Sequence, residues 1–447
     1  MQSTRPTQPG IIIAAPSSNS GKTVITLALL RALTRKGHAI AAAKTGPDYI
    51  DPAFQSAACR GSCINLDPWA MSPAQIRSLS TNHGADKSFL MCEGVMGLFD
   101  GAANGSGSTA DLAAMTGWPV VLVVDVKGQS ASAAALISGF ASFRDDINIA
   151  GVILNRVGSA RHKQMIVDAC ATHLPDIPII GAVRRSDTLL LPERHLGLVQ
   201  AGEHPELEAF LDHAADIIAE DIDLDAFVGL TKAQNAPMPA VAASTTASHD
   251  IAPLGRHIAI ARDAAFAFSY AHLLEGWRRA GAEISFFSPL ADETPNSECD
   301  AIYLPGGYPE LHAAKLAAAG AFKASLRTAT ENGVVIYGEC GGFMTLGTHL
   351  TDANGSCHEM LGLLPLATSF ATRKLHLGYR EATLAIETPF GPVGTVLRGH
   401  EFHYATTLTQ TGSSLCQMRN ATGDDLGPAG LVHGRVFGSF FHMVAQG

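Results

Sequence analysis

In the first half of the chain, short apolar runs alternate with helical stretches. The apolar runs, rich in Ile and Val, are GIIIAAP, HAIAAAK, SFLMCEG, PVVLVVDV, NIAGVILN and DIPIIGAV, and stretches such as 23–36 and 130–140 lie between them. Strands of a buried parallel sheet are apolar throughout, and helices make the crossings between them. The alternation therefore predicts an α/β domain with a mostly parallel sheet covered by helices on both faces.

A second domain is expected because the chain has 447 residues, enough for two or three cores. Residues 231–255 are rich in Ala, Ser, Thr and Pro without any period, which is typical of a linker. A second α/β set follows, with the runs HIAIARD, EISFFSPL, AIYLPGGYPE, GVVIYGECGG and VFGSFFH. We therefore expect one domain over residues 1–230, a linker over 231–255 and a second α/β domain over 256–447.

Composition and charge exclude several classes of protein. The formal net charge is −10 and no Lys/Arg-rich run is present, so we expect no nucleic-acid surface. The longest apolar runs are far short of a membrane span, and the N-terminal residues have no apolar signal-peptide core. None of the eight cysteines forms a CxxC pair, and most are expected to be free thiols. These features favour a cytoplasmic protein that does not associate with membranes.

The stretch IIIAAPSSNSGKTVITLALL reads as a strand, a tight loop and a helix. Its Ser20-Gly21-Lys22-Thr23 matches the end of the phosphate-loop pattern GxxxxGK[ST], although Pro16 stands at the first glycine. Such a loop directs backbone N–H groups and a helix N-terminus toward an anion. Lys22 is expected to reach the β- and γ-phosphates of ATP, and the Thr23 hydroxyl to bind Mg²⁺.

Carboxylates that could complete a magnesium site follow two other predicted strands. Asp48 lies in KTGPDYIDP and Glu93 in MCEGVMGLFDG. Because the carboxyl ends of parallel strands share one edge of a sheet, these residues and Thr23 could meet there, with Lys44 as a phosphate or carboxylate contact. The alternative is that Asp48 and Asp51 form turns beside the neighbouring prolines.

Two further polar residues end predicted strands. Asp125 ends PVVLVVD and could support the metal site indirectly, and Asn155 ends GVILN and is a candidate for adenine recognition. Both could equally be polar groups whose hydrogen bonds are satisfied locally.

The second domain contains GVVIYGECGGFMTLG, which reads as a strand, a sharp turn and a helix. This layout is that of a nucleophile elbow, in which glycines permit a strained turn that exposes Cys340. The helix N-terminus is expected to lower the pKa of the thiol. The backbone N–H of Gly341, with a second donor from Gly306 or Gly307 in LPGGYPE, could form an oxyanion hole. The alternative is a buried structural cysteine.

A cysteine nucleophile needs a base. His442 in GSFFHM is the best candidate, because it follows an apolar run and is expected to end a strand; His400, His403 and His433 are competitors. HEFH does not match the zinc motif HExxH. His400, Glu401 and His403 are expected either to line a substrate or interdomain surface or to pack in the core.

A phosphate loop followed by an ECGG elbow resembles the a,c-diamide synthases of cobalamin biosynthesis, a group of ATP-dependent amidotransferases that also includes cobyric acid synthase. The matching segments extend over the whole chain: SGKT, KTGPDYIDP, EGVMGLFDG, LPERHLGLV, ISFFSPLAD, LPGGYPELHAAKL, YGECGGFM and RGHEFHY. The resemblance implies an N-terminal dethiobiotin-synthetase-like ATP domain and a C-terminal class I glutamine amidotransferase-like domain.

Carried over by position, the resemblance implies that Lys22 and Thr23 bind ATP and Mg²⁺, and that Asp48 and Glu93 lie at the metal. It also implies that Cys340 attacks glutamine with His442 as its base. Related glutaminases often have a glutamate two residues after this histidine, where this chain has Val444, so a Cys–His dyad is expected. NLDPWAM, LFDGAANGSGSTADLAA, KLHLGYR and the FFHMVAQG terminus resemble the branch that uses metal-free hydrogenobyrinic acid rather than cobalt-containing cobyrinic acid.

The reaction implied is phosphorylation of the a and c acetate carboxylates, c before a, followed by displacement of phosphate by ammonia from glutamine. A corrin polycarboxylate needs a basic surface, for which the candidates are Arg184, Arg185, Arg194 and His195 in AVRRSDTLLLPERHLG, or else these form an exposed charged loop. A homodimer is plausible from the family.

Two rival functions remain open. One is a related enzyme such as cobyric acid synthase. The other is a partitioning-type ATPase switch, but such proteins carry an extra lysine where this chain has Ser17, and an ECGG elbow has no role in them.

Overall fold

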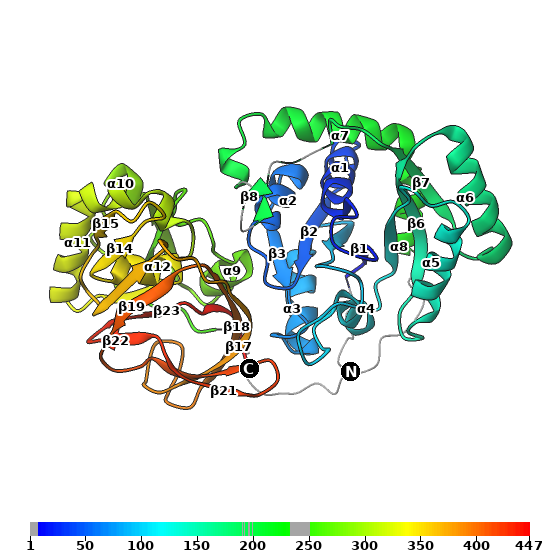
Figure 1. The fold of residues 1–447 in the computed structure, drawn as a ribbon. Coiled ribbons are helices and arrows are strands. Elements are labelled where there is room, and N and C mark those ends of the chain that lie inside the picture. Colours follow the sequence, from blue (N-terminus) through cyan, green and yellow to red (C-terminus); the bar gives the residue numbers. More distant parts are fainter. Residues whose placement is uncertain (1–7, 190, 192, 195–196, 199, 233–250) are drawn as a thin grey trace. The chain divides into compact units, whose positions relative to one another are not determined.

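The computed structural model describes residues 8–189, 191, 193–194, 197–198, 200–232 and 251–447. The chain forms two compact units, Met1–Thr246 and Ala247–Gly447, each considered separately (Figure 1). Most of the expected linker lies outside the described residues. Its first two residues belong to the helix α8 (Leu224–Lys232).

A seven-stranded sheet forms the centre of the first unit, in the order β3-β2-β4-β1-β5-β6-β7, and all its pairings are parallel. The strands are β1 (Gly10–Ala14), β2 (Ile40–Thr45), β3 (Cys63–Leu66), β4 (Phe89–Glu93), β5 (Val120–Asp125), β6 (Ile149–Val157) and β7 (Ile179–Arg184). The six apolar runs each contribute a strand, so the predicted parallel sheet is confirmed. The short β3 was not predicted, because CINL is too brief to stand out.

Helices cover this sheet on both faces (Figure 1). They are α1 (Lys22–Arg35), α2 (Asp51–Cys59), α3 (Pro73–His83), α4 (Thr109–Thr116), α5 (Ser132–Ser142), α6 (Ala160–His173), α7 (Leu207–Asp221) and α8. α1 packs on both α2 and α7, whereas α3 contacts α4 and α5 contacts α6. Parallel strands are joined by right-handed crossovers, so helices that lead in opposite directions along the sheet lie on opposite faces.

A six-stranded sheet in the order β11-β10-β12-β13-β23-β22 forms the core of the second unit. Its strands are β10 (His257–Ala261), β11 (Glu283–Phe287), β12 (Ala301–Leu304), β13 (Val335–Glu339), β22 (Leu431–His433) and β23 (Val436–Ser439). Only the β22–β23 pairing at its edge is antiparallel. The helices of this unit are α9 (Ala271–Arg279), α10 (Ala313–Ala318), α11 (Gly320–Glu331) and α12 (Gly341–Leu346).

Two further sheets complete the second unit, and neither was predicted. One has the order β21-β20-β17-β18-β24 and is antiparallel throughout. Its strands are β17 (His376–Leu384), β18 (Val396–His403), β20 (Cys416–Asn420), β21 (Asp425–Ala429) and β24 (His442–Gln446). The other contains β14 (His349–Thr351), β15 (Cys357–Glu359), β16 (Leu366–Ser369) and β19 (Thr406–Gln410). Many of these strands are half exposed, so they lack the continuous apolar runs of the buried sheet.

No helix in the described part of the chain is long and apolar enough to cross a membrane.

Candidate active site

The loop between β1 and α1 closes on the helix N-terminus at Gly21, whose φ of 84° is left-handed. A Cβ atom at this position would collide with the side-chain amide of Asn155, so only glycine fits here. Asn155 Nδ2 donates a hydrogen bond to the Ser20 carbonyl oxygen at 2.8 Å. The Ser20 hydroxyl donates to the Ser17 carbonyl oxygen, also at 2.8 Å. The loop is thus stabilised by a hydrogen bond between two of its own residues and by a hydrogen bond from Asn155 on β6.

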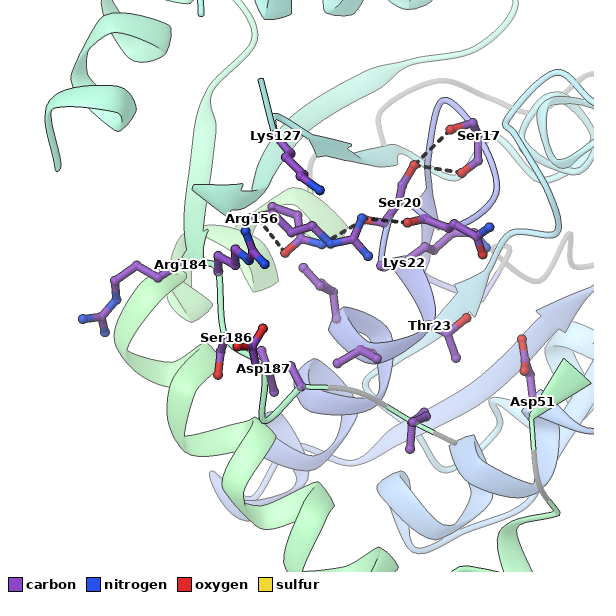
Figure 2. Close-up of a pocket in the computed structure, with 18 residues that line it drawn as sticks. Ser17, Ser20, Lys22, Thr23, Asp51, Lys127, Arg156, Arg184, Ser186 and Asp187 are labelled. Carbon is purple, nitrogen blue, oxygen red and sulfur yellow. Dashed lines mark hydrogen bonds between the residues drawn. The ribbon is translucent and has the colours of Figure 1, made fainter. Parts of the chain in front are cut away.

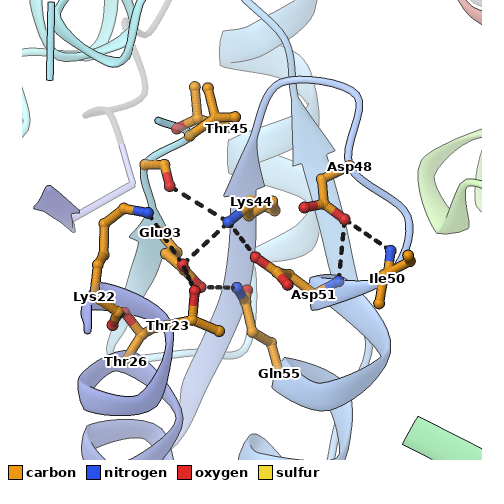
Figure 3. A network of polar contacts seen from close by, with 12 residues as sticks. Lys22, Thr23, Thr26, Lys44, Thr45, Asp48, Ile50, Asp51, Gln55 and Glu93 are labelled. Atoms are coloured by element: carbon orange, nitrogen blue, oxygen red, sulfur yellow. Dashed lines mark hydrogen bonds and ion pairs between the residues drawn. The ribbon is translucent and has the colours of Figure 1, made fainter. Parts of the chain in front are cut away.

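A fully buried carboxylate, Glu93, lies beside this loop at the end of β4 (Figure 3). The Thr23 hydroxyl donates to its Oε1 at 2.6 Å. The ammonium groups of Lys44 and Lys22 lie 3.1 and 3.4 Å from the same oxygen. Burial alone would raise the pKa of Glu93, but the two lysines and the Thr23 hydroxyl outweigh it and lower that pKa. The structure therefore brings together Lys22, Thr23, Lys44 and Glu93, as expected from the strand ends.

The two aspartates of KTGPDYIDP have different surroundings. Asp48 Oδ1 accepts hydrogen bonds from the backbone N–H groups of Ile50, at 2.8 Å, and of Asp51, at 3.1 Å. It thereby stabilises the turn that begins α2, which is the alternative noted from the sequence. Asp51, rather than Asp48, forms the ion pair with Lys44, with Oδ2 at 2.6 Å from Nζ. A metal role for Asp48 stays a prediction.

The sequence did not indicate Gln55, one helical turn after Asp51 on α2. Its side chain is fully buried, and Nε2 donates to Glu93 Oε2 at 2.6 Å. The Oε1 atom of Gln55 accepts a hydrogen bond from the Cys63 thiol at 3.1 Å. Since residues four apart share one helix face, the spacing of the two polar residues in DPAFQ was the signal that could have revealed it.

These residues fit a Mg²⁺ ion bound together with nucleotide phosphates. Among the described residues, no group of three or more His, Cys, Asp or Glu side chains is placed to hold a metal ion by itself. Mg²⁺ usually takes only one or two protein oxygens beside phosphates and water, and Thr23 with Glu93 supplies that set. When bound, the ion would neutralise charge on the transferred phosphoryl group.

A cavity of about 750 Å³ opens over the loop (Figure 2). Its lining is mixed: the apolar residues are Val24, Ile25, Leu189 and Leu191, and the others are Ser17, Asn19, Ser20, Gly21, Lys22, Thr23, Asp51, Lys127, Asn155, Arg156, Arg184, Arg185, Ser186 and Asp187. Several cationic side chains thus face a loop built to bind an anion. A cavity of this size holds a nucleotide.

Arg156 was also missed from the sequence. Its backbone has a positive φ of 59°. Its guanidinium donates to the Asn19 carbonyl oxygen at 3.0 Å and pairs with Asp125. Asp125 therefore contacts the loop through Arg156, and its indirect support of a metal site stays a prediction. Asn155 lines the cavity while it braces the loop, and its role in adenine recognition stays a prediction.

The structure describes the four residues proposed for the corrin substrate to different extents. Arg184 lines the cavity but is paired with Glu220 at 3.3 Å and Asp221 at 3.2 Å on α7. Arg185 lines the same cavity and is exposed. For Arg194 only the backbone is described, in the two-residue strand β8 (Glu193–Arg194), and His195 lies outside the described residues.

In the second unit, Cys340 occupies the sharp turn between β13 and α12. Its φ of 46° and ψ of −99° lie outside the favoured regions for a residue with a side chain, as a nucleophile elbow requires. A Cβ atom at Gly341 would lie 3.0 Å from the Gly307 backbone nitrogen and 2.9 Å from Pro309 Cδ. The structure thus brings the N–H groups proposed for the oxyanion hole, from Gly307 and Gly341, to the same turn.

The thiol environment corrects one expectation. Burial raises the pKa of Cys340 well above its ordinary value, the carboxylate of Glu310 adds to this, and the Gly341 N–H only partly opposes it. α12 has six residues, and Cys340 is only 4 % exposed. Because desolvation outweighs the helix dipole, the protein alone does not stabilise a thiolate, and a base is needed.

His442 lies close to this turn. β13 pairs with β23 in parallel, with Glu339 opposite Ser439, and the Cys340 N–H donates to the Ser439 carbonyl oxygen at 2.8 Å. A Cβ atom at Gly306 would collide with the His442 imidazole, so the loop after β12 approaches that ring. The expectation that His442 ends a strand is wrong, because β23 stops at Ser439 and His442 begins β24.

The competing histidines have other surroundings. His400 is buried, stacks on His442 with centroids 5.2 Å apart, and shares a 2.7 Å hydrogen bond with the Tyr270 hydroxyl. His403 is buried against Phe440, with centroids 4.0 Å apart. For these two residues the structure favours core packing.

The remaining two polar residues lie toward the surface. Glu401 forms an ion pair with Arg380 at 2.7 Å. His433 is exposed on β22.

Comparison with known proteins agrees with this two-part description. Residues 11–199 match the CobQ/CobB/MinD/ParA nucleotide binding domain, and residues 257–447 match the CobB/CobQ-like glutamine amidotransferase domain. The chain is 56 % identical over 440 residues to a hydrogenobyrinate a,c-diamide synthase of Brucella anthropi, covering 97 % of this chain and 98 % of the relative. Relatives with the same name from Rhizobium meliloti and Mesorhizobium japonicum are 52 % and 51 % identical, with coverage of at least 97 % of both chains.

Fold and site together define an enzyme of the glutamine amidotransferase class with its own nucleotide-binding domain. The chain belongs to the hydrogenobyrinate a,c-diamide synthase family.

Proposed function

We propose that this enzyme uses ATP and glutamine to amidate the a and c acetate carboxylates of hydrogenobyrinic acid during cobalamin biosynthesis. The observation that carries the proposal is near full-length identity of 51–56 % to relatives named for this reaction. The alternatives are the same reaction on cobalt-containing cobyrinic acid and a related corrinoid amidotransferase such as cobyric acid synthase.

The first unit supports a phosphoryl-transfer step. Lys22 and Thr23 begin α1 below a cavity lined by cationic groups, and Glu93 lies within hydrogen-bond distance of Thr23. In our proposal the γ-phosphoryl group of ATP passes to a substrate carboxylate and forms an acyl phosphate. Such a transfer needs positioning and charge neutralisation, which Lys22 and a Mg²⁺ ion held by Thr23 and Glu93 would supply.

The second unit supports release of ammonia from glutamine. In our proposal Cys340 attacks the glutamine side-chain carbonyl after His442 accepts the thiol proton. The backbone N–H groups of Gly307 and Gly341 would stabilise the tetrahedral oxyanion. Ammonia leaves, and the glutamyl thioester is hydrolysed. Ammonia then attacks the acyl phosphate, and inorganic phosphate is released.

The test is to incubate the purified enzyme with ATP, Mg²⁺ and amide-¹⁵N glutamine, and with hydrogenobyrinic or cobyrinic acid in separate reactions. We expect mass spectrometry to show two ¹⁵N amides on the metal-free substrate. Two amides on the cobalt substrate alone would move the enzyme to the other branch. No amide on either would overturn the proposed function.

A further inference from the structure

Glu339, the residue immediately before Cys340, has no role in the reaction as described so far. It ends β13, and its side chain is only 1 % exposed. Its Oε2 lies 3.8 Å from Nδ1 of His442, a side chain that is fully buried. In the described part of the chain, no Lys or Arg forms an ion pair with this carboxylate. A buried carboxylate without a permanent cation is costly, so its presence beside His442 needs an explanation.

Three donors from three strands hold this carboxylate in place. The Tyr303 hydroxyl on β12 donates to Oε2 at 2.6 Å, and the Tyr337 hydroxyl on β13 donates to Oε1 at 2.9 Å. The backbone N–H of Met443 on β24 also donates to Oε1, at 3.1 Å. Met443 directly follows His442, so this hydrogen bond fixes the backbone next to the histidine. The other carboxylate oxygen of Glu339 lies beside Nδ1 of the His442 ring.

We propose that Glu339 is the positioning residue for His442, and that it supplies the negative charge that related glutaminases place two residues after the histidine, where this chain has Val444. The inference rests on the proposed glutaminase function. In the reaction, His442 Nε2 takes the proton from the Cys340 sulfur, and the sulfur bonds to the carboxamide carbon of glutamine. The C–N bond then breaks, and His442 returns the proton to the departing ammonia. Across the 3.8 Å that separates Oε2 from Nδ1, the charge of Glu339 favours the ring orientation with Nδ1–H toward the carboxylate, and it stabilises the imidazolium that exists between the two proton transfers.

The surroundings of His442 show why such a charge is needed. Burial lowers the pKa of His442 well below its ordinary value, and His400 and His403 on β18 lower it further. Without a nearby anion, this imidazole would be a poor acceptor for a thiol whose pKa is raised. Burial raises the pKa of the Cys340 thiol, and the carboxylates of Glu310, Glu339 and Glu401 raise it further.

Glu339 itself changes its charge near neutral pH. Burial raises its pKa to about 7, although hydrogen bonds from Tyr303, Met443 and Tyr337 oppose the rise. The anionic form, which the proposed role requires, therefore predominates only above about pH 7. The rate of glutamine hydrolysis should therefore fall as the pH falls through this value. Because the hydrogen bond from Tyr303 lowers the pKa of Glu339, Tyr303 should affect the pH at which the rate falls.

The first variant is Glu339→Gln, which keeps the shape of the side chain and its ability to accept from Met443 but removes the charge. We expect kcat for glutamine hydrolysis to fall on the order of 10- to 1,000-fold, with little change in KM for glutamine. The decline in kcat that centres near pH 7 in the parent enzyme should also disappear. Glu387→Gln, an exposed glutamate in the turn after β17, is the matched control and should retain the parent rate and pH profile.

Tyr303→Phe provides an independent variant that retains the carboxylate. It removes a hydrogen bond that lowers the pKa of Glu339, so the acid limb of kcat should move to higher pH, and activity lost at pH 7 should return at pH 8.5. The inference is overturned if Glu339→Gln has the kcat of the parent enzyme and the same decline of kcat near pH 7. It is also overturned if the decline in Tyr303→Phe occurs at the same pH as in the parent enzyme.

Cys340→Ser separates this inference from the proposed function. If Cys340→Ser abolishes glutamine hydrolysis while Glu339→Gln changes nothing, the glutaminase assignment stands and the role of Glu339 is wrong. If Cys340→Ser hydrolyses glutamine at the parent rate, the proposed function and the inference both fail.

Discussion

The ammonium group of Lys44 lies 3.1 Å from Glu93 Oε1, where neighbouring strands place the two residues directly opposite each other in the β2–β4 pairing. The same ammonium is 2.6 Å from Asp51 Oδ2. Lys44 is 2 % exposed and Glu93 fully buried, so each compensates the other's charge. Burial alone would lower the pKa of Lys44, but the carboxylates of Asp51 and Glu93 hold it above its ordinary value.

Lys44→Met should therefore destabilise the first unit strongly, because it leaves Glu93 and Asp51 with less compensation in a buried site. Loss of one partner of a buried ion pair typically costs about 3–5 kcal/mol. Urea unfolding at pH 7 measures this change. Lys127→Met, at an exposed cavity position, is the control and should change stability by less than about 0.5 kcal/mol. Equal unfolding midpoints for the two variants would contradict the pairing.

Lys22→Ala should abolish amidation with either glutamine or ammonia as the nitrogen source, because both routes need the acyl phosphate. Within the described residues, the Lys22 ammonium forms a single ion pair, at 3.4 Å with Glu93, and Thr23 and Lys44 still contact that carboxylate in the variant. The protein should consequently remain folded by circular dichroism. Turnover near the parent rate would refute the phosphate role of Lys22.

Gln55→Leu should weaken the binding of Mg²⁺ during ATP turnover, because it removes a contact to Glu93 and none to the nucleotide. It removes the 2.6 Å hydrogen bond that fixes Glu93 Oε2, which leaves a buried acceptor unsatisfied at a cost of about 1–3 kcal/mol. We expect the Mg²⁺ concentration for half-maximal ATP hydrolysis to rise about 10-fold. Ser56→Ala, at the next position on α2, is the control. An unchanged Mg²⁺ titration would show that Glu93 needs no such support.

Cys340→Ser should lose glutamine-dependent amidation while amidation driven by ammonium salts continues. The hydroxyl is a far weaker nucleophile than the thiol, whereas ammonia bypasses the second unit altogether. Product masses with each nitrogen source give the answer. Loss of the ammonia-driven reaction as well would mean that Cys340 is not confined to glutamine hydrolysis.

The stability of Glu339→Gln relative to the parent should depend on pH. The pKa of Glu339 is raised by burial to about 7 in the folded state, from an ordinary value near 4.5, so the folded protein retains a proton that the unfolded chain releases. This contribution to stability is complete below about pH 4.5 and is lost as the pH rises through 7. The free energy of unfolding of the variant should therefore rise relative to the parent between pH 5 and 8, by roughly 3 kcal/mol at most. A difference that stays constant across this range would contradict the raised pKa.

Local patterns were sufficient for much of the first unit. Continuous apolar runs indicated six of the seven strands, and strand ends placed Thr23, Lys44 and Glu93 at one edge of the sheet. The half-exposed antiparallel strands of the second unit were not predicted, because their side chains alternate between core and solvent and form no continuous apolar run. The pairing of Asp51 with Lys44 and the role of Gln55 were not predicted, because polar helix residues that face a sheet edge cannot be distinguished in a sequence from other polar residues.

Local sequence was enough to predict the class of each unit, the loop that ends at Gly21 and the elbow at Cys340, since backbone geometry at a tight turn depends mainly on adjacent residues. Three other properties follow only from the folded chain: the carboxylates that pair with Lys44, the raised pKa of Cys340, and the position of Glu339 beside His442. Those properties depend on burial and on groups far apart in the chain, because the energy of a charge in a protein is set by its surroundings in space.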